Sequence, residues 1–249
     1  MADTQTTARV FRLVEDQVIP RLLQARRGGQ PSRCPDQGHI ETLVRLALAR
    51  DAQAAAAQVA ALRESGMAAS TVLSELITPA ARRLGTLWCD DSIDFLDTTI
   101  AAGRLAGAVR QCSAPIEPAA PGAPAALIAT PPRERHILGA SVFSQLLRAA
   151  GWRVREAIGA SRSELAALAA AEPYAMIGLS VSDVESLEFA AGVVKRARAA
   201  SANQAAILAI GGPAACVSED LAGRLGIDIA TGDGAKAVEL AKHHLSRTR

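Results

Sequence analysis

The sequence predicts an α/β protein in which a helical bundle is followed by a doubly wound sheet of five parallel strands. Before residue 113 every periodic segment has its apolar residues at helical spacing. From residue 125 onward, five short apolar runs alternate with helical segments. Strands that alternate with helices form a parallel sheet with helices on both faces, because the crossover connections are right-handed.

A proline-rich stretch separates the two parts. Residues 113–124 read SAPIEPAAPGAP, with a proline at every third position from Pro115 to Pro124. This spacing favours an extended connector over a helix or a strand. We therefore expect a helical cap domain over 1–112, a linker over 113–124 and a Rossmann-like domain over 125–249.

The first part is expected to hold four or five helices. The segment 8–27 places Val10, Leu13, Val14, Val18 and Leu22 at helical spacing, with a kink or break at Pro20. A loop over 28–38, with His39 at its end, precedes two helices within 39–66 that meet near Arg50 and Asp51. Residues 68–91 and 92–112 are also helical, the latter with Ser92 as N-cap and Asp94 in its first turn.

In the second part, the apolar runs have the length of buried strands. The expected strands are 125–130, 152–158, 174–180, 205–212 and 227–231. The helices between and after them are expected at 138–151, 161–173, 184–201, 218–226 and 234–247.

Composition and charge exclude several classes of protein. The chain has 249 residues, 27 basic and 25 acidic, and a net charge of +2, so it lacks the basic footprint of a nucleic-acid-binding protein. Its four cysteines show neither a CxxC pair nor metal-ligand spacing, which favours free thiols in a reducing compartment. Charges interrupt the N-terminal apolar pattern, and no uncharged run has membrane-spanning length. A cytoplasmic protein that binds no membrane is expected.

Candidate site residues follow three of the strands. His136 follows the first strand, Ser180 ends the third, and Gly211 with Gly212 ends the fourth. In an open parallel sheet, ligands bind at the carboxyl ends of the strands, so these residues are expected on one rim. The stretch PPRERH replaces the GxGxxG of dinucleotide sites, and the paired aspartates of phosphorylated receiver domains are missing. The leading functional group is therefore the imidazole of His136, with the carboxylate of Glu134 two residues before it.

The combination Glu134-x-His136-x-x-Gly139, with IGLS at the third strand and ILAIGG at the fourth, resembles the cobalamin-binding domain of methionine synthase and corrinoid photoreceptors. That family has Asp-x-His-x-x-Gly, so Glu134 is a departure. The resemblance implies that His136 is the lower axial ligand of cobalt and that Glu134 orients it, which suits imidazole chemistry. It also implies that small residues flank the nucleotide tail of the cofactor: Gly139, Ser180, Ser182, Gly211 and Gly212.

The helical part carries a second resemblance. RRLGTLWCDDSIDFLDTTIAAGRL is similar to the four-helix cap that covers the upper face of cobalamin, in which a GxLW stretch precedes an acidic turn. This implies that Trp88 lies over the upper ligand, although a tryptophan that anchors helix packing is an equally good interpretation. CarH-type photoreceptors have a Glu-His pair where this chain has Thr98 and Thr99, which argues against upper ligation by histidine.

The variant ERHILG and the N-terminal LVEDQVIPRLLQARR resemble the AerR/PpaA family of purple photosynthetic bacteria. The resemblance implies a light-responsive transcriptional regulator without enzymatic activity, which binds cobalamin in its hydroxo, aquo or alkyl form. It would act as an antirepressor on a CrtJ/PpsR-type repressor of photosynthesis genes and contact DNA only indirectly. Two alternatives stay open: a corrinoid shuttle that carries methyl groups between methyltransferases, and a redox sensor that holds heme through the same His136.

Overall fold

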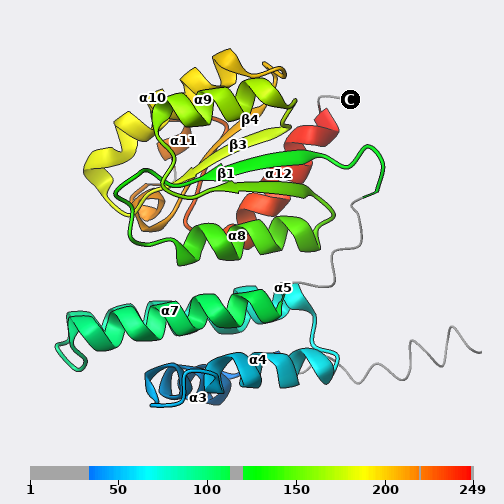
Figure 1. The fold of residues 1–249 in the computed structure, drawn as a ribbon. Helices are drawn as coiled ribbons and strands as arrows, with labels where there is room; N and C mark the ends of the chain where they lie inside the picture. Colours follow the sequence, from blue (N-terminus) through cyan, green and yellow to red (C-terminus); the bar gives the residue numbers. More distant parts are fainter. Residues whose placement is uncertain (1–33, 113–119, 219, 248–249) are drawn as a thin grey trace, which may run out of the picture.

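The computed structural model describes residues 34–112, 120–218 and 220–247, and Figure 1 shows them as a helical layer beneath an α/β layer. The helices of the lower layer are α3 (Gln37–Leu48), α4 (Ala54–Glu64), α5 (Ala69–Thr71), η2 (Val72–Ile77), α6 (Thr78–Cys89) and α7 (Phe95–Gln111). α5, η2 and α6 follow one another without a break, and η2 is a π-helical stretch. The predicted helix over 8–27 and most of the predicted linker over 113–124 lie outside the described residues.

Two sequence expectations in this layer are wrong at helix starts. His39 was expected in a loop, but it lies in the first turn of α3, where the Asp36 carboxylate accepts a hydrogen bond from its N–H at 3.0 Å. Ser92 was expected to cap α7, but Asp94 is the N-cap and accepts from the N–H of Asp97 at 2.7 Å. In both cases a carboxylate satisfies a backbone donor of the first turn and also suits the positive end of the helix dipole.

Arg104 of α7 closes the other end of α3. Its guanidinium donates to the carbonyl oxygen of Ala47 at 2.7 Å and also to that of Ala49. The last carbonyls of a helix have no partner within the helix, so a guanidinium at this place satisfies them. The contact fixes the α3–α4 turn against α7.

The upper layer holds five parallel strands, as the sequence predicts, and their order is β2-β1-β3-β4-β5. The strands are β1 (Ala125–Ala129), β2 (Arg153–Ala157), β3 (Met176–Ser180), β4 (Ile207–Gly211) and β5 (Ile229–Ala230). β1 is buried along its whole length, as expected of a strand covered on both faces.

Helices cover both faces of the sheet, so the doubly wound prediction is confirmed. α8 (Leu138–Ala149) and α12 (Gly234–Arg247) share one apolar cluster with Ala126 and Ile128 of β1. α9 (Arg162–Ala171), α10 (Leu187–Ala200) and α11 (Leu221–Leu225) share the other cluster with Leu127 and its neighbours. Two short 3₁₀ turns, η3 (Val184–Ser186) and η4 (Pro213–Cys216), follow β3 and β4.

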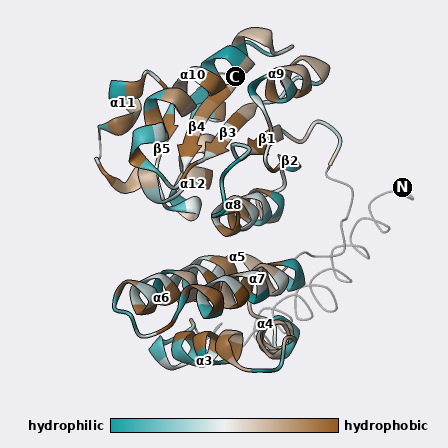
Figure 2. Ribbon diagram, turned by 60° about the vertical axis from the view of Figure 1, so that its left-hand side comes forward, coloured by the Kyte–Doolittle hydropathy of each residue, from teal (hydrophilic) through white to brown (hydrophobic). Residues whose placement is uncertain are grey.

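The helical layer packs on the α8 face of the α/β layer. α5, η2 and α7 contact α8, and one apolar cluster runs from the helical bundle through α8 to the sheet. Figure 2 shows α8 and α12 facing α5 and α7 across this boundary, while α9 and α10 lie on the far side of the sheet. None of the helices in the described part combines the length and apolarity that a membrane crossing requires.

Candidate functional site

The rim loops after β1 and β3 form the centre of the candidate site. β1 and β3 are neighbours in the sheet, but the chain turns from β1 toward β2 and from β3 toward β4. Such a reversal of strand order opens a crevice at the carboxyl ends of the two strands. The loop with Glu134 and His136 and the loop with Ser182 lie on opposite sides of this point.

Glu134 joins the two loops. One of its carboxylate oxygens accepts from the N–H of His136 at 2.7 Å, and the other accepts from the N–H of Ser182 at 2.9 Å. The Ser182 hydroxyl donates to the same carboxylate at 2.9 Å. The side chain of Glu134 is only 7% exposed, so its negative charge is stabilised by these hydrogen-bond donors and not by bulk water.

His136 points one ring nitrogen at Glu134 and leaves the other for a ligand. Its Nδ1 lies 3.1 Å from Glu134 Oε1, while the side chain is 66% exposed. A carboxylate beside Nδ1 favours the tautomer that carries its proton there, which leaves the lone pair on Nε2. The arrangement is that of a histidine prepared to bind a metal ion through Nε2.

Two opposing effects act on the Glu134 carboxyl. Burial alone would raise its pKa, but the N–H groups of His136 and Ser182, the Ser182 hydroxyl and the His136 ring together hold the pKa below its usual value. Hydrogen bonds to the charged form therefore outweigh desolvation. Glu134 stays an anion at neutral pH and can support a positive charge on the ring or on a metal bound to it.

Two glycines lie beside the hydroxyl of Ser180. An ideal Cβ on Gly139 would lie 4.0 Å from Ser180 Oγ, and one on Gly212 would lie 3.0 Å from the same oxygen. Gly212 has φ +91°, and its added Cβ would also stand 2.9 Å from the Val181 nitrogen. Ser180 itself is 7% exposed. The predicted residues Gly139, Ser180 and Gly212 therefore meet at one place. Glycine at 212 lets the chain pass close to the Val181 backbone, and only Gly139 leaves open space beside Ser180.

Gly211 has a different place. It pairs with Ser180 in the sheet register, and an ideal Cβ on it would lie 3.6 Å from the carbonyl oxygen of Thr231, after β5. Gly211 therefore lies beside the rim loop that follows β5, next to Ser180 and the two glycines beside it.

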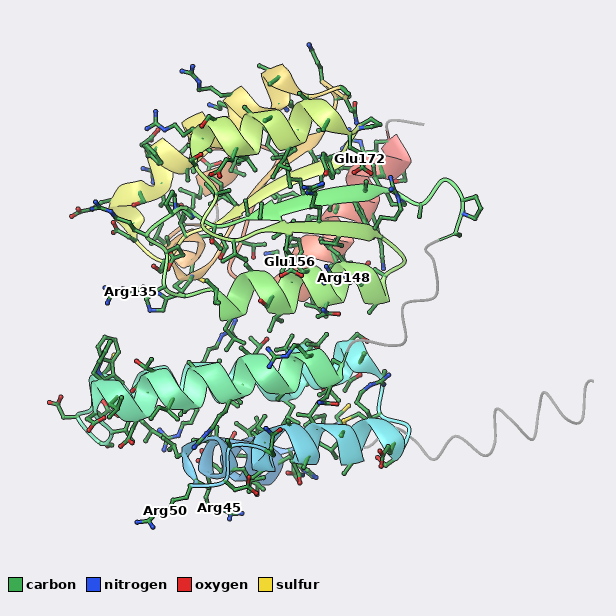
Figure 3. The ribbon with its side chains drawn as sticks, viewed as in Figure 1. Arg45, Arg50, Arg135, Arg148, Glu156 and Glu172 are labelled. Carbon is green, nitrogen blue, oxygen red and sulfur yellow. The ribbon has the colours of Figure 1, made fainter. Side chains whose placement is uncertain are left out.

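Trp88 lies in the helical layer, apart from the Glu134 network. It is the penultimate residue of α6 and is 46% exposed, and Phe95 at the start of α7 is 62% exposed. Figure 3 shows Arg135, the neighbour of His136, at the rim between the layers, above the end at which α7 begins. The hydroxyls of Thr98 and Thr99 donate to the carbonyl oxygens of Asp94 and Phe95 at 2.8 Å, so these threonines satisfy their own helix.

Sequence reasoning missed two features of this region. The link from Ser182 to Glu134 depends on strand order, which places the two loops side by side although they are 48 residues apart. A cavity of about 300 Å³ also lies where the π-helical part of the cap meets the start of α12. It is lined by Ser74, Glu75, Thr78, Arg82, Leu146, Asp233, Gly234 and Ala235. No sequence signal marks it, because its residues come from three separate segments.

Comparisons with known proteins agree with this geometry. Residues 124–242 match the B12 binding domain family. An uncharacterized 20.5 kDa protein in the bchF-crtJ intergenic region of Rhodobacter capsulatus is 29% identical over 160 residues, which cover 63% of this chain and 83% of that protein. The monomethylamine corrinoid protein of Methanosarcina barkeri superposes with a TM-score of 0.69 at 15% identity, over 86% of this chain and 100% of that one. The last likeness confirms the predicted fold.

Proposed function

Because residues 124–242 match the B12 binding domain family, we propose that the chain is a light-responsive, cobalamin-binding regulator of transcription. One observation carries the proposal: Glu134 holds Nδ1 of His136 and leaves Nε2 to bind a metal. The partner in this proposal is a CrtJ/PpsR-type repressor, on which the protein acts as an antirepressor.

The residues around the rim fit the cofactor. Nε2 of His136 would bind cobalt, with Glu134 orienting the ring and Ser182 fixing Glu134. Gly139 and the small Ser180 would leave space for the nucleotide tail, while Gly211 and Gly212 let the β3, β4 and β5 loops approach one another at this rim. Trp88 and Phe95 offer exposed apolar surface for the upper side. Bound cobalamin would supply a cobalt centre whose upper ligand can be exchanged or released by light.

The chain's own residues explain how a change at the upper side could reach the surface. Trp88 and Phe95 lie on either side of the α6–α7 turn, and α7 packs on α8, which follows the His136 loop. A shift of this turn would alter the exposed cap surface at one end of the bundle. We propose that this surface is what the repressor contacts, and that DNA is contacted only through the repressor.

The bacterial relative supports regulation over catalysis. That relative lies in the bchF-crtJ intergenic region, and the sequence resemblance to AerR/PpaA proteins supports a role in regulation. Among the described residues no group of three or more His, Cys, Asp or Glu side chains could hold a metal ion, so cobalt binding would depend on His136 and the corrin together. The corrinoid shuttle is the second candidate, since the superposed archaeal structure is a corrinoid protein of the same fold.

An absorption titration tests the proposal. The protein is mixed in the dark with hydroxocobalamin, adenosylcobalamin, methylcobalamin or hemin, desalted, and then illuminated. Retained corrin bands that change with light, and that are lost in His136→Ala but kept in the matched surface variant His243→Ala, support a cobalamin photoregulator. Corrin retention without any effect of light on repressor binding favours the shuttle. A Soret band alone would overturn the cobalamin assignment.

A further inference from the structure

One face of α7 is apolar along its length, and most of it is exposed in the part of the chain that the structure describes. Leu96, Ile100, Gly103 and Gly107 follow one another at spacings of four, three and four, so they share one side of the helix. We name these four residues the α7 stripe. Leu96 is 63% exposed and Ile100 is 41% exposed, whereas Ala101 and Leu105 on the opposite side are fully buried in the bundle.

The α7 stripe carries no side chain at Gly103 and Gly107, and we call this part of the stripe the groove. An ideal Cβ on Gly103 meets nothing within 4 Å, and one on Gly107 meets only the guanidinium of Arg110, from the same helix, at 3.4 Å. Glycine inside a helix lowers its stability relative to alanine, so two of them on an open face need a reason. A close approach of another backbone would supply one.

We propose that residues 8–19 of this chain dock on the α7 stripe as a helix. In that segment Val10, Val14 and Val18 recur every fourth residue, with Phe11 beside them, and an amphipathic helix of this kind must bury its apolar side. The valines match the groove in shape, because short branched side chains fill the space over glycine. The segment also carries Glu15, which borders the valine side of such a helix and would face the Arg110 guanidinium at the end of the stripe.

The stretch of chain between residues 8–19 and Cys34 is long enough for the segment to reach the α7 stripe. The described residues begin at Cys34, next to α3, and α3 contacts Arg104 of α7 at its far end. α3 has 12 residues and therefore spans about 18 Å at 1.5 Å per residue. The stretch from Val18 to Cys34 can extend over roughly 50 Å, which is about twice the length of the 17-residue helix α7 at 1.5 Å per residue.

Amide hydrogen exchange in the full-length protein tests the docking. Residues 8–19 should exchange roughly tenfold or more slowly than the same residues in a synthetic peptide of residues 1–33. Gly103→Glu should remove this protection, because it places a charged side chain in the groove while raising helix propensity. Val14→Asp should also remove this protection, because it places a charge on the apolar side of residues 8–19.

Gly192→Glu is the matched control. Gly192 is an exposed glycine of α10 whose added Cβ also meets nothing within 4 Å, so the substitution is chemically identical but lies on the far face of the sheet. It should leave the protection of residues 8–19 unchanged. Unprotected amides in the natural protein, or equal protection in Gly103→Glu, would overturn the proposal. Protection that grows with protein concentration, together with a doubled mass in light scattering, would assign the stripe to a second copy and overturn it too. None of these readouts needs cobalamin.

Discussion

The carboxylate of Glu134 and both donors of Ser182 are joined by hydrogen bonds of 2.9 Å, across the point at which strand order reverses. Two loops that the sequence separates by 48 residues thereby form one support for His136. In the proposed cobalamin-bound state, this support would determine how rigidly the His136 imidazole is oriented, because residues that are hydrogen-bonded to a metal ligand set its tautomer and its basicity.

Replacing Glu134 by glutamine should weaken cobalamin binding about tenfold, and replacing His136 by alanine should weaken it more, since loss of an outer partner of a metal ligand costs 10- to 100-fold. The glutamine keeps one oxygen acceptor but loses the charge that supports the ring. Binding is followed by titration of the corrin absorption. Glu185→Gln, an exposed change near the end of the Ser182 loop, is the control and should bind as the natural protein does. Equal affinity in Glu134→Gln and the control would remove Glu134 from the site.

Because the pKa of Glu134 is lowered, we expect the rigidity of the loops after β1 and β3 to depend on pH. Because the pKa is lower in the folded protein than in the unfolded chain, the charged carboxylate contributes stability above the unfolded value of about 4.3. This contribution is lost as the pH falls through the folded value, so the loops should loosen below about pH 4. Hydrogen exchange of the Ser182 N–H between pH 3 and 6, corrected for intrinsic rates, measures this. The same pH profile in Glu134→Gln would contradict the assignment to this carboxyl.

Gly212 and Gly139 should respond differently to alanine. Gly212 has φ +91°, and its new Cβ would overlap the carbonyl oxygen of Val181, so Gly212→Ala should cost about 1–3 kcal/mol of unfolding free energy. Gly139→Ala would make only an ordinary contact with Ser180 and should leave the stability of the cofactor-free protein unchanged. If the space beside Ser180 holds part of the cofactor, Gly139→Leu should weaken cobalamin binding. Thermal unfolding and cobalamin titration of the variants separate the two effects, and undiminished binding by Gly139→Leu would place the cofactor elsewhere.

The sequence was sufficient for the sheet because β1, β3 and β4 are short apolar runs between helices, although the edge strand β2 carries three charged residues. The run at 125–130 has no polar residue before Thr130, and its structure is a strand buried on both faces. The contact between Glu134 and His136 was also accessible, since the two residues are close in sequence and form a local motif. Local spacing and apolar pattern carry this kind of information directly.

Contacts between distant segments could not be predicted in the same way. Arg104 closes the end of α3 from more than 50 residues away, and nothing in its neighbourhood distinguishes it from the other arginines of the bundle. The N-cap of α7 was misplaced because Ser92 and Asp94 are both good caps, and only the backbone of the preceding turn selects Asp94. Such choices are made by packing rather than by local propensity.

Removing the Arg104 guanidinium should destabilise the helical layer. Arg104→Ala leaves the carbonyls of Ala47 and Ala49 without their charged donor, which should lower the unfolding free energy by about 2 kcal/mol. Arg110 lies on the same helix, is exposed and makes one weak bond to Ala106 at 3.3 Å, so Arg110→Ala is the matched control. Chemical denaturation followed by circular dichroism measures both. Equal losses of unfolding free energy in the two variants would mean that the contact between Arg104 and α3 contributes no more to stability than an exposed surface hydrogen bond does.

Cys112 should be the slowest of the four thiols to react. It is buried at the end of α7, and burial raises the pKa of its thiol to about 11, although Arg63 opposes the rise. Only about one thiol in a thousand is then a thiolate at pH 8, and the thiolate is the reactive form. Cys34, Cys89 and Cys216 are exposed. Mass spectrometry after brief maleimide labelling should therefore show three modified cysteines in the native protein and a fourth only after unfolding. In Cys112→Ala the native count should stay at three, and a fall to two would show that Cys112 had been accessible.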